Sequence, residues 1–487
     1  MKKIIFSLAL LTIIMSGCDN NTDDFNNNQD AQYDVSPEVL FTNAQVELAN
    51  QMTTPSVNLN PFRFFSQYWA QTTYNDETRY RLTTRAVADN HWNNLYRNVL
   101  GNLQSAKDLV AAQSVPAGVP AGEWQINHKN QLAIIEILQV YTFQVLVDSF
   151  GDIPYSQALN TNILLPVYDD DAAIYPQLIT RLNNAIADLD ESGESWVNSD
   201  VIYNGDVGLW HLFANSLKVK LGINLADVNP GLAQSTIESA FAAGVILNNS
   251  QNATFEFSGS APNYNPLYGD LEASNRNDFV AADTFINSLT ALDDPRIAVY
   301  FNDVEGQYIG GIYGAANNNY ASFSQIGDRF RAAGLPSELF EASEVNFYLA
   351  EAAARGYSVG NTAEHYYNEG IRMSFEYWGL PATEAEDYLA MPEVAFATAS
   401  TDWREMIGMQ EWVAFYNRPF ESWNSYRRLD FPQLQAPTNA VAAAEGEVPK
   451  RLPYPVSERT VNNAQYVAAS AAIGGDKMIT HVFWDVD

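Results

Sequence analysis

Residues 148–159 read DSFGDIPYSQAL, and they directly follow residues 130–147, the most apolar stretch beyond the N-terminus. Gly151 suits the left-handed position that ends a helix, and Pro154 prevents that helix from resuming. Polar side chains interrupt the apolar stretch and charged ones flank it, namely Glu136, Gln139, Gln144, Lys129 and Asp148. A long helix buried in a large globular body fits this pattern better than a membrane span.

The composition limits the kinds of partner that the chain can have. It has 487 residues, of which 47% are hydrophobic and 17% charged, enough to bury a sizeable core. Its 26 basic and 58 acidic residues give a formal net charge of −32. This acidity excludes nucleic acid, which needs a basic surface. It also excludes simple electrostatic adhesion to anionic lipid headgroups.

The first 17 residues have the pattern of a signal peptide. Two lysines precede an apolar stretch at residues 4–15, and the small residues Ser16 and Gly17 follow it. Cys18 comes next and is the only cysteine, so the chain has neither an intramolecular disulfide nor a cysteine-based zinc site. The pattern resembles a bacterial lipobox, whose cysteine is lipidated and becomes the mature N-terminus. The alternative is an ordinary secreted protein with one unmodified cysteine.

Residues 18–36 are expected to form a flexible acidic tether. Residues 19–34 read DNNTDDFNNNQDAQYD, a composition that cannot bury apolar surface. Acyl chains on Cys18 would anchor the tether through buried CH₂ groups, which an acidic body does not oppose. The first aspartates resemble the export signal that sends Bacteroidetes lipoproteins to the outer face of the outer membrane. A plain acidic spacer is the alternative.

Helical periodicity dominates residues 37–487, and no linker divides them, so we expect a single mostly α-helical domain. Ser36, Pro37 and Glu38 supply the start signals of a helix over about residues 39–52. Several helices occur in pairs with short connections, which indicates helix hairpins of the tetratricopeptide type. Further helices are predicted near residues 171–190, 207–227, 231–244, 341–356, 362–378 and 402–416.

Residues 258–334 differ from the rest because they lack helical periodicity. They are rich in Gly and Asn and carry many Tyr and Phe side chains. Loops of this length are uncommon in a compact body and are often functional. We therefore expect this loop-rich stretch to have a functional role.

Motifs for catalysis, metal binding and cofactor binding are missing from the sequence. The five histidines form no HExxH motif, and no GxSxG, P-loop or GxGxxG pattern occurs. Residues 169–171 are three aspartates, which an acidic helix N-terminus explains better than a calcium site. The sequence therefore gives little support to catalysis, and we predict neither a cofactor nor a metal.

Five blocks of sequence together resemble one family. Residues 148–159 are similar to the D-x-x-G-D-I-P-Y-S-x-A block of SusD-like proteins, in particular the SusD/RagB nutrient-binding outer-membrane lipoproteins. The other blocks follow in the family's order, at residues 203–218, 344–352, 410–428 and 451–455. The similarity spans about residue 38 to the C-terminus.

The resemblance implies a mostly helical body with tetratricopeptide-like hairpins on one side and the ligand site on the other. SusD-like proteins are not enzymes. They are surface-exposed outer-membrane lipoproteins that sit on a SusC-like TonB-dependent β-barrel transporter and deliver oligosaccharides or polysaccharides to it. In some members the ligand is a peptide, and this stays open here.

Two segments meet the chemical needs of a sugar, which are flat rings for its CH faces and polar partners for its hydroxyls. Residues 67–81 read QYWAQTTYNDETRYR and offer Trp69, Tyr74, Asn75 and Arg81. The loop-rich stretch offers a second set, namely Tyr308, Tyr320 and Phe323.

We expect Trp69 and Tyr320 to contact the ligand, since polar residues flank both rings. For each ring, burial in the core is the alternative. Four further tryptophans lie on helical stripes and are assigned to the core, namely Trp92, Trp210, Trp378 and Trp412.

Glu344 and Glu351 lie on an otherwise apolar predicted helix and need partners. Arg427, Arg428 and Arg451 are the candidates, because a bidentate guanidinium–carboxylate pair suits a partly buried site.

Two other functions remain open from sequence alone. A groove lined by aromatic side chains can hold peptide instead of glycan, and an acidic surface favours cationic peptides. A lipid-anchored glycoside hydrolase would need two carboxylates facing each other across a cleft, roughly 5–9 Å apart.

Overall fold

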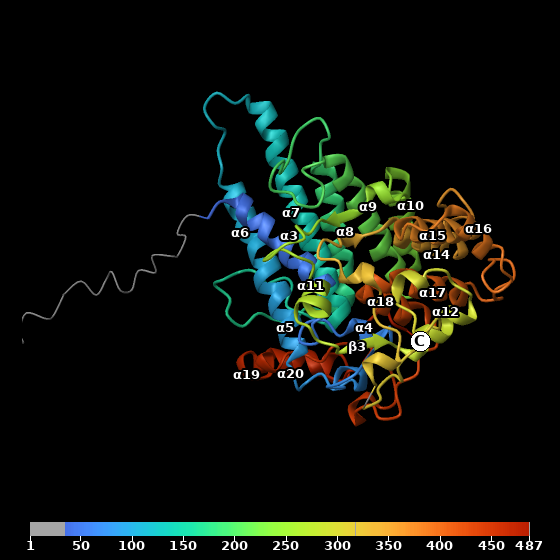
Figure 1. The fold of residues 1–487 in the computed structure, drawn as a ribbon. Coiled ribbons are helices and arrows are strands. Elements are labelled where there is room, and N and C mark those ends of the chain that lie inside the picture. Colours follow the sequence, from blue (N-terminus) through green and yellow to red (C-terminus); the bar gives the residue numbers. More distant parts are fainter. Residues whose placement is uncertain (1–34, 317, 487) are drawn as a thin grey trace, which may run out of the picture. The chain divides into compact units, whose positions relative to one another are not determined.

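The computed structural model describes residues 35–316 and 318–486 (Figure 1). The predicted signal peptide, Cys18 and nearly all of the predicted tether lie outside these residues, so these features stay predictions. From Pro37 onward the described residues form one compact unit.

This unit is mostly helical, as the sequence predicts. The helices are α3 Pro37–Thr53, α4 Phe62–Phe65, α5 Val87–Asn93, α6 Gly101–Ala111, α7 Ala121–Phe150, α8 Asp171–Asp188, α9 Val207–Asn224, α10 Pro230–Ala243, α11 Pro266–Tyr268, α12 Asp283–Ala291, α13 Ile297–Tyr300, α14 Ala342–Ala354, α15 Ala363–Tyr377, α16 Ala382–Leu389, α17 Trp403–Ala414, α18 Pro419–Leu429, α19 Val456–Val461 and α20 Asn463–Ala472. Two π-helical turns, η2 Asn94–Leu100 and η4 Gly269–Ala273, join them. Short 3₁₀ turns occur at Glu77–Arg79, Asn249–Gln251, Tyr320–Ser322, Asp328–Arg331, Phe415–Asn417 and Ala442–Ala444.

Five of the predicted helices begin where the sequence provides a capping side chain. A side-chain oxygen accepts a backbone N–H at the start of α8, α9, α10, α15 and α17, from Asp170, Asp206, Asn229, Thr362 and Asp402 respectively. Such caps satisfy N–H groups that have no partner inside the helix. The predicted ends run up to three residues past the observed ones, because periodicity marks a helix end less sharply than a cap marks its start.

Consecutive helices pack as hairpins: α7 on α8, α9 on α10 and α14 on α15 (Figure 1). Two glycines permit close approach. A Cβ at Gly222 would lie 2.6 Å from Ile237 on the partner helix, and one at Gly370 would lie 2.8 Å from the Phe347 ring. Larger side chains would force these pairs apart. Whether the hairpins are of the tetratricopeptide type stays a prediction.

Helix α7 contains the apolar stretch that precedes residues 148–159. Among the described residues it is the one helix long and apolar enough to cross a membrane, and 89% of its most apolar window is buried inside the protein. It is therefore a core helix, as predicted. Gly151 follows it at a φ of +76° and a ψ of −123°, which is a positive-φ region open to glycine but not the left-handed helical conformation that was expected.

The described residues contain four short strands. Strand β1 (Trp69–Gln71) pairs antiparallel with β3 (Phe279–Ala281), and Trp69 lies opposite Ala281. Strand β2 (Ala253–Phe255) pairs antiparallel with β4 (Ser337–Phe340). The β1–β3 pair joins the two segments in which ligand residues were predicted.

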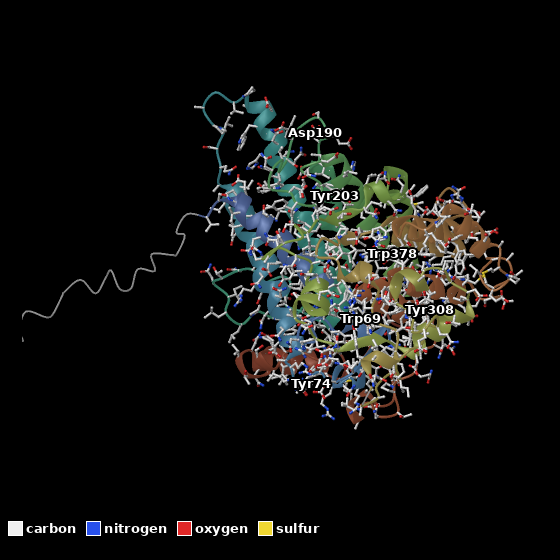
Figure 2. All side chains as sticks on the ribbon, in the orientation of Figure 1. Trp69, Tyr74, Asp190, Tyr203, Tyr308 and Trp378 are labelled. Atoms are coloured by element: carbon white, nitrogen blue, oxygen red, sulfur yellow. The ribbon has the colours of Figure 1, made fainter. Side chains whose placement is uncertain are left out.

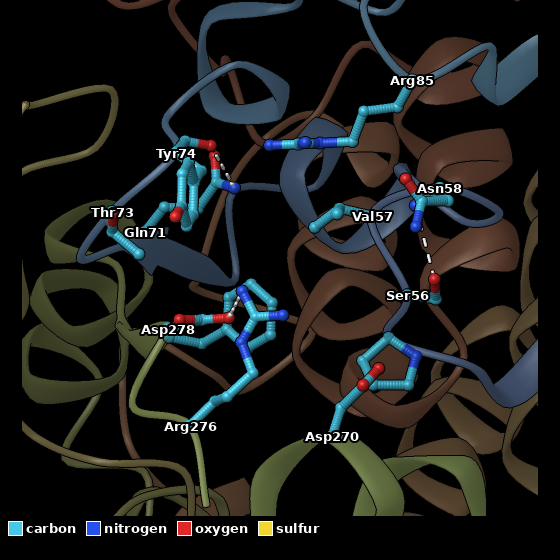
Figure 3. Close-up of a pocket in the computed structure, with 12 residues that line it drawn as sticks. Ser56, Val57, Asn58, Gln71, Thr73, Tyr74, Arg85, Asp270, Arg276 and Asp278 are labelled. Carbon is cyan, nitrogen blue, oxygen red and sulfur yellow. Dashed lines mark hydrogen bonds and ion pairs between the residues drawn. The ribbon is translucent and has the colours of Figure 1, made fainter. Parts of the chain in front are cut away.

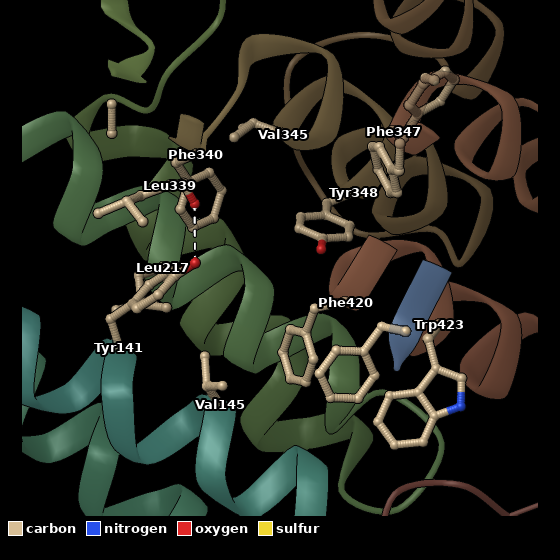
Figure 4. Close-up of a cluster of buried hydrophobic side chains, with 14 of the residues drawn as sticks. Tyr141, Val145, Leu217, Leu339, Phe340, Val345, Phe347, Tyr348, Phe420 and Trp423 are labelled. Atoms are coloured by element: carbon tan, nitrogen blue, oxygen red, sulfur yellow. Dashed lines mark hydrogen bonds between the residues drawn. The ribbon is translucent and has the colours of Figure 1, made fainter. Parts of the chain in front are cut away.

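Aromatic side chains fill the core between the hairpins. Figure 4 shows Tyr141 of α7 beside Phe340 of β4, with Phe420 and Trp423 of α18 nearby. The Tyr141 hydroxyl donates to the Leu339 carbonyl at 3.2 Å. The four tryptophans assigned to the core from sequence are all buried, namely Trp92, Trp210, Trp378 and Trp412.

Buried ion pairs tie α14 to α17 and α18. Arg428 pairs with Glu351 at 3.0 Å and with Glu411 at 3.2 Å, so the predicted arginine partner of Glu351 is confirmed. Glu344 instead pairs with Lys220 at 3.3 Å and with Arg418.

Neither of the other two candidate arginines pairs with these glutamates. Arg427 donates to the Lys450 carbonyl and stacks on Trp423, while Arg451 pairs with Asp476 at 2.8 Å. Arg451 also donates to the Phe150 carbonyl at 3.0 Å, so it links the end of α7 to the C-terminal segment rather than to α14.

The carboxylate of Asp148 connects five parts of the chain. It is fully buried and accepts from the Tyr175 hydroxyl of α8 and from Trp484 Nε1 of the C-terminal segment at 2.9 Å. It also accepts from amide side chains of three helices, namely Gln144 of α7, Asn224 of α9 and Asn424 of α18. Burial raises the pKa of Asp148, and the hydrogen bonds from Tyr175 and Gln144 and the charge of Arg427 oppose that rise.

We expect Asp148→Ala to lower the free energy of unfolding by about 3–5 kcal/mol, because the substitution leaves several buried donors without an acceptor. Urea denaturation followed by circular dichroism measures the change. Asp188→Ala is the matched control, since Asp188 lies on the exposed end of α8 and, within residues 35–316 and 318–486, its one ion pair is with Lys129. The control should change the free energy by less than about 1 kcal/mol. Equal losses in the two variants would contradict the role of Asp148.

Candidate functional site

Trp69 lies in the core, which corrects the prediction that it contacts a ligand. Its exposed fraction is 0%, and its Nε1 donates to the Tyr416 hydroxyl at 2.8 Å. The ring packs on Phe279, with the Arg63 guanidinium 4.9 Å from its centroid. The polar residues that flank Trp69 in sequence do not make it exposed, because β1 is buried along its whole length.

Tyr74, five residues further on, is the exposed ring of this segment. Its exposed fraction is 65%, and its backbone adopts a φ of +50° in the turn that follows β1 (Figure 2). The Arg85 guanidinium lies 5.8 Å from the centroid of the ring. Gln71 holds the turn by donating to the Tyr74 carbonyl at 3.0 Å. The turn thus exposes a large aromatic face, and the hydrogen bond from Gln71 holds the turn in place.

Tyr74 lines a pocket of about 320 Å³, which we call the Tyr74 pocket. Figure 3 shows Tyr74 and Thr73 on one side and Ser56 and Asn58 on the other. The lining residues are Pro55, Ser56, Val57, Asn58, Gln71, Thr73, Tyr74, Arg85, Asp270, Arg276, Asp278 and Phe279.

The β1–β3 pairing builds the pocket. It continues past Gln71, where the Thr72 N–H donates to the Asp278 carbonyl at 2.9 Å and the Thr72 hydroxyl donates to the Asn277 carbonyl at 2.6 Å. The turn at Tyr74 is therefore held beside the loop of Arg276. Two segments about 200 residues apart in sequence meet because of this strand pair.

The charges in the pocket are largely paired. Arg85 donates to Glu77 at 2.7 Å, and Arg276 pairs with Asp278 at 2.5 Å. Burial raises the pKa of Glu77, and hydrogen bonds from Gln71 and Arg85 oppose the rise. Burial likewise raises the pKa of Asp270.

Three other polar side chains of the pocket are free to bind a ligand. Asn58, Thr73 and Asp270 make no side-chain hydrogen bond within the described part of the chain.

The other predicted residues of the first segment lie outside the pocket. Asn75 is half-buried and donates to the Gln71 carbonyl at 3.1 Å, so it stabilises the turn. Arg81 is exposed and lies 3.7 Å from Asp76. A ligand role for these two residues stays a prediction.

The predicted residues of the second segment do not line the Tyr74 pocket either. Tyr308, Tyr320 and Phe323 are half-buried and pack against the core. Tyr320 accepts from Arg331 at 2.7 Å, and Arg331 also pairs with Glu272 of η4 at 2.6 Å. Turn η4 also contributes Asp270 to the Tyr74 pocket. Arg331 therefore connects Tyr320 to an element that lines this pocket. A ligand role for these three rings stays a prediction.

Sequence reasoning missed several lining residues. Residues 55–58 contain neither an aromatic nor a charged side chain, so nothing in that segment indicates a site. Asp270, Arg276 and Asp278 lie in the loop-rich stretch that was expected to bind the ligand, and that stretch was the signal that could have identified them. Arg85 lies just beyond the segment that was singled out.

Three carboxylates, those of Asp152, Asp170 and Asp171, lie within 4.8 Å of one another at the start of α8. Each carboxylate accepts a hydrogen bond from a backbone N–H group. The N–H of Asp171 donates to Asp152, and the N–H of Ala172 donates to Asp170 and to Asp171. Burial, with the charges of Asp152 and Asp170, raises the pKa of Asp171 to about 7. These contacts are those of a capped helix N-terminus.

The raised pKa of Asp171 predicts a pH-dependent stability. A carboxyl group in an unfolded chain titrates near pH ~4, so the folded protein holds this proton more tightly. Its contribution to stability is complete below pH ~4 and is lost as the pH rises through about 7. Relative to Asp171→Asn, the wild type should lose free energy of unfolding over that range, by about 1.4 kcal/mol for each pH unit. Urea titrations at several pH values measure the difference, and a constant difference would contradict the raised pKa.

The burial of Trp69 also predicts how two substitutions differ. Trp69→Ala should lower the free energy of unfolding by about 3–5 kcal/mol, because it leaves a cavity in the core and removes the hydrogen bond that Trp69 Nε1 donates to the Tyr416 hydroxyl. Tyr74→Ala should change it by less than about 1 kcal/mol, since the ring is exposed. Thermal and urea unfolding measure both. A Trp69→Ala protein with wild-type stability would contradict the core assignment.

Comparison with known proteins identifies the family. The SusD-like family model described as "Starch-binding associating with outer membrane" matches residues 27–455. No curated protein matches the chain.

Solved structures agree with the family match. A chitin-binding SusD homologue from Flavobacterium johnsoniae is 26% identical, with a TM-score of 0.77 over 92% of this chain and 97% of that one. A SusD homologue from Bacteroides uniformis is 26% identical, with a TM-score of 0.74 over 92% and 99%. A homologue from Bacteroides thetaiotaomicron at 24% identity shares the fold, with a TM-score of 0.76 over 93% and 99%. The chain belongs to the SusD-like family of starch-binding proteins associated with the outer membrane.

Proposed function

We propose that this protein captures an oligosaccharide or polysaccharide at the Tyr74 pocket and delivers it to a SusC-like TonB-dependent transporter in the outer membrane. The observation that carries the capture step is the exposed Tyr74 ring on the wall of a polar pocket. Membership of a starch-binding, outer-membrane-associated family supports the same step.

The pocket offers both kinds of contact that a sugar needs. The Tyr74 ring provides a flat apolar surface for the CH face of a pyranose. Asn58 and Thr73 can each donate to and accept from hydroxyl groups, and Asp270 can accept. Within the described residues, these three side chains make no hydrogen bond that they would have to give up on binding, so the ligand gains their hydrogen bonds at little internal cost.

We propose a neutral glycan as the ligand. The family is described as starch-binding and the Flavobacterium johnsoniae homologue as chitin-binding, and both of these polymers are uncharged. The net charge of −32 would repel an acidic polysaccharide.

We propose that a lipid on Cys18 holds the body at the exterior of the outer membrane. The lipobox-like pattern before Cys18 supports this, since a body of such acidity needs a hydrophobic rather than an electrostatic attachment. In this arrangement the protein binds and hands over its ligand without hydrolysing it, in keeping with a family of binding proteins.

Tyr74→Ala should weaken glycan binding about tenfold, since it removes the stacking surface. Isothermal titration calorimetry of the full chain in detergent with maltohexaose and with chitohexaose measures the affinity. Tyr74→Phe is the matched control and should bind like the wild type, because it keeps the ring.

Three results would overturn the proposal. Unchanged affinity in Tyr74→Ala would place the ligand elsewhere. Binding of cationic peptides but of neither hexasaccharide would make the protein a peptide receptor. Release of shorter sugars from either hexasaccharide would make it a hydrolase.

A further inference from the structure

We propose that a second pocket, which adjoins the Tyr74 pocket, binds the continuation of the same glycan chain. It has a volume of about 440 Å³ and is lined mainly by asparagine side chains, so we call it the asparagine pocket. This proposal rests on the proposed function of the Tyr74 pocket. It makes the ligand a chain long enough to occupy both pockets rather than a single sugar or a disaccharide.

Helix α3, helix α5 and the π-helical turn η2 form the asparagine pocket. Helix α3 contributes Glu47 and Asn50, and α5 contributes Asn90 and Asn93. Turn η2 contributes three more polar side chains, namely Asn94, Arg97 and Asn98. Gln51, Thr54, Leu59 and Pro266 complete the lining.

Two separate segments each contribute to both pockets, which places the pockets side by side. In the first segment, residues 55–58 line the Tyr74 pocket, while Thr54 and Leu59 on either side line the asparagine pocket. In the second, Asp270 lines the former and Pro266 the latter. Asn90 donates to the Asn58 carbonyl at 3.0 Å across the shared wall.

Part of the amide lining is fixed by internal hydrogen bonds. Asn94 donates to Gln51 at 2.9 Å, Asn98 donates to Asn94 at 2.5 Å, and Arg97 donates to Asn98 at 3.1 Å. These bonds orient the side chains before any ligand arrives, which lowers the entropy cost of binding.

Two other amides of the lining are free. Within the described residues, the side chains of Asn50 and Asn93 make no hydrogen bond, although both line the pocket. An amide carries two donor hydrogens and an acceptor oxygen, so each can bond to a hydroxyl group in either sense.

The turn η2 is π-helical. Hydrogen bonds between residues i and i+5 widen such a turn, and π-helical turns are rare and occur frequently at functional sites. Asn94 and Asn98 lie four residues apart in η2, where both line the pocket and share a hydrogen bond. Core packing does not require these polar residues, because Leu95, Val99 and Leu100 of the same turn supply the buried face.

The lining indicates a neutral, hydroxyl-rich ligand. One glutamate and one arginine balance in charge, and the remaining polar groups are mostly uncharged amides. None of the described residues that line the pocket is aromatic, so this lining provides hydrogen bonds without a stacking surface. Such a site binds weakly by itself, but it strengthens binding of a ligand that the Tyr74 pocket already holds.

The test compares a short and a long ligand on the full chain in detergent. The probes are the disaccharides and hexasaccharides of the malto and chito series, measured by calorimetry. In the double variant Asn50→Ala/Asn93→Ala, hexasaccharide affinity should fall about tenfold, as expected for two lost hydrogen bonds, while disaccharide affinity stays unchanged. Neither substitution removes an internal hydrogen bond, so the variant should fold, and thermal melting verifies this. Asn43→Ala, an exposed position on α3 outside the pocket, is the matched control.

The outcomes separate the two proposals. If the wild type binds neither series, the proposed function fails and this inference fails with it. If the wild type binds glycan but the double variant binds the hexasaccharide as tightly as the wild type does, only the asparagine pocket is overturned. An equal loss for disaccharide and hexasaccharide would also overturn it, because the asparagines would then contribute to the first pocket.

Discussion

The buried carboxylate of Asp148 is the contact on which the rest of the structure depends. A charge removed from water is costly unless donors surround it, and here the donors come from α7, α8, α9, α18 and the C-terminal segment. Helices that are distant in sequence must therefore converge on a single pair of oxygen atoms. This requirement fixes how the hairpins are placed against each other more narrowly than apolar packing alone, because hydrogen bonds are directional.

The ligand side is built by a different constraint. The two-stranded pairing of β1 with β3 holds the Tyr74 turn beside the loop of Arg276, and the core beneath it is closed by Trp69. The strand pair thus separates a buried ring that supports the site from an exposed ring that is available to a ligand. The asparagine pocket extends the same surface, since residues 54–59 form the wall between the two pockets.

Much of the fold follows from the sequence, and the reasons are local. Helix starts were predictable because Asp170, Asp206 and Asn229 cap the turns that follow them, and the core role of α7 followed from its apolar run. The site was less predictable. Trp69 and Tyr74 have similarly polar neighbours in sequence, and only the pairing of β1 with β3 decides which ring faces solvent. Long-range pairing of this kind leaves no local pattern, and for the same reason Glu344 pairs with Lys220 and Arg418 rather than with the arginines expected from sequence.

The position of Tyr74 on a turn outside the helical body has an evolutionary consequence. Residues of the pocket rim, such as Tyr74, Asn58 and Arg276, contact the Asp148 network nowhere, so their replacement leaves the scaffold's stability almost untouched. Substitutions of a few rim side chains can therefore change the ligand specificity during evolution while the fold is kept. Divergent sequences that share one backbone are the expected outcome of that freedom.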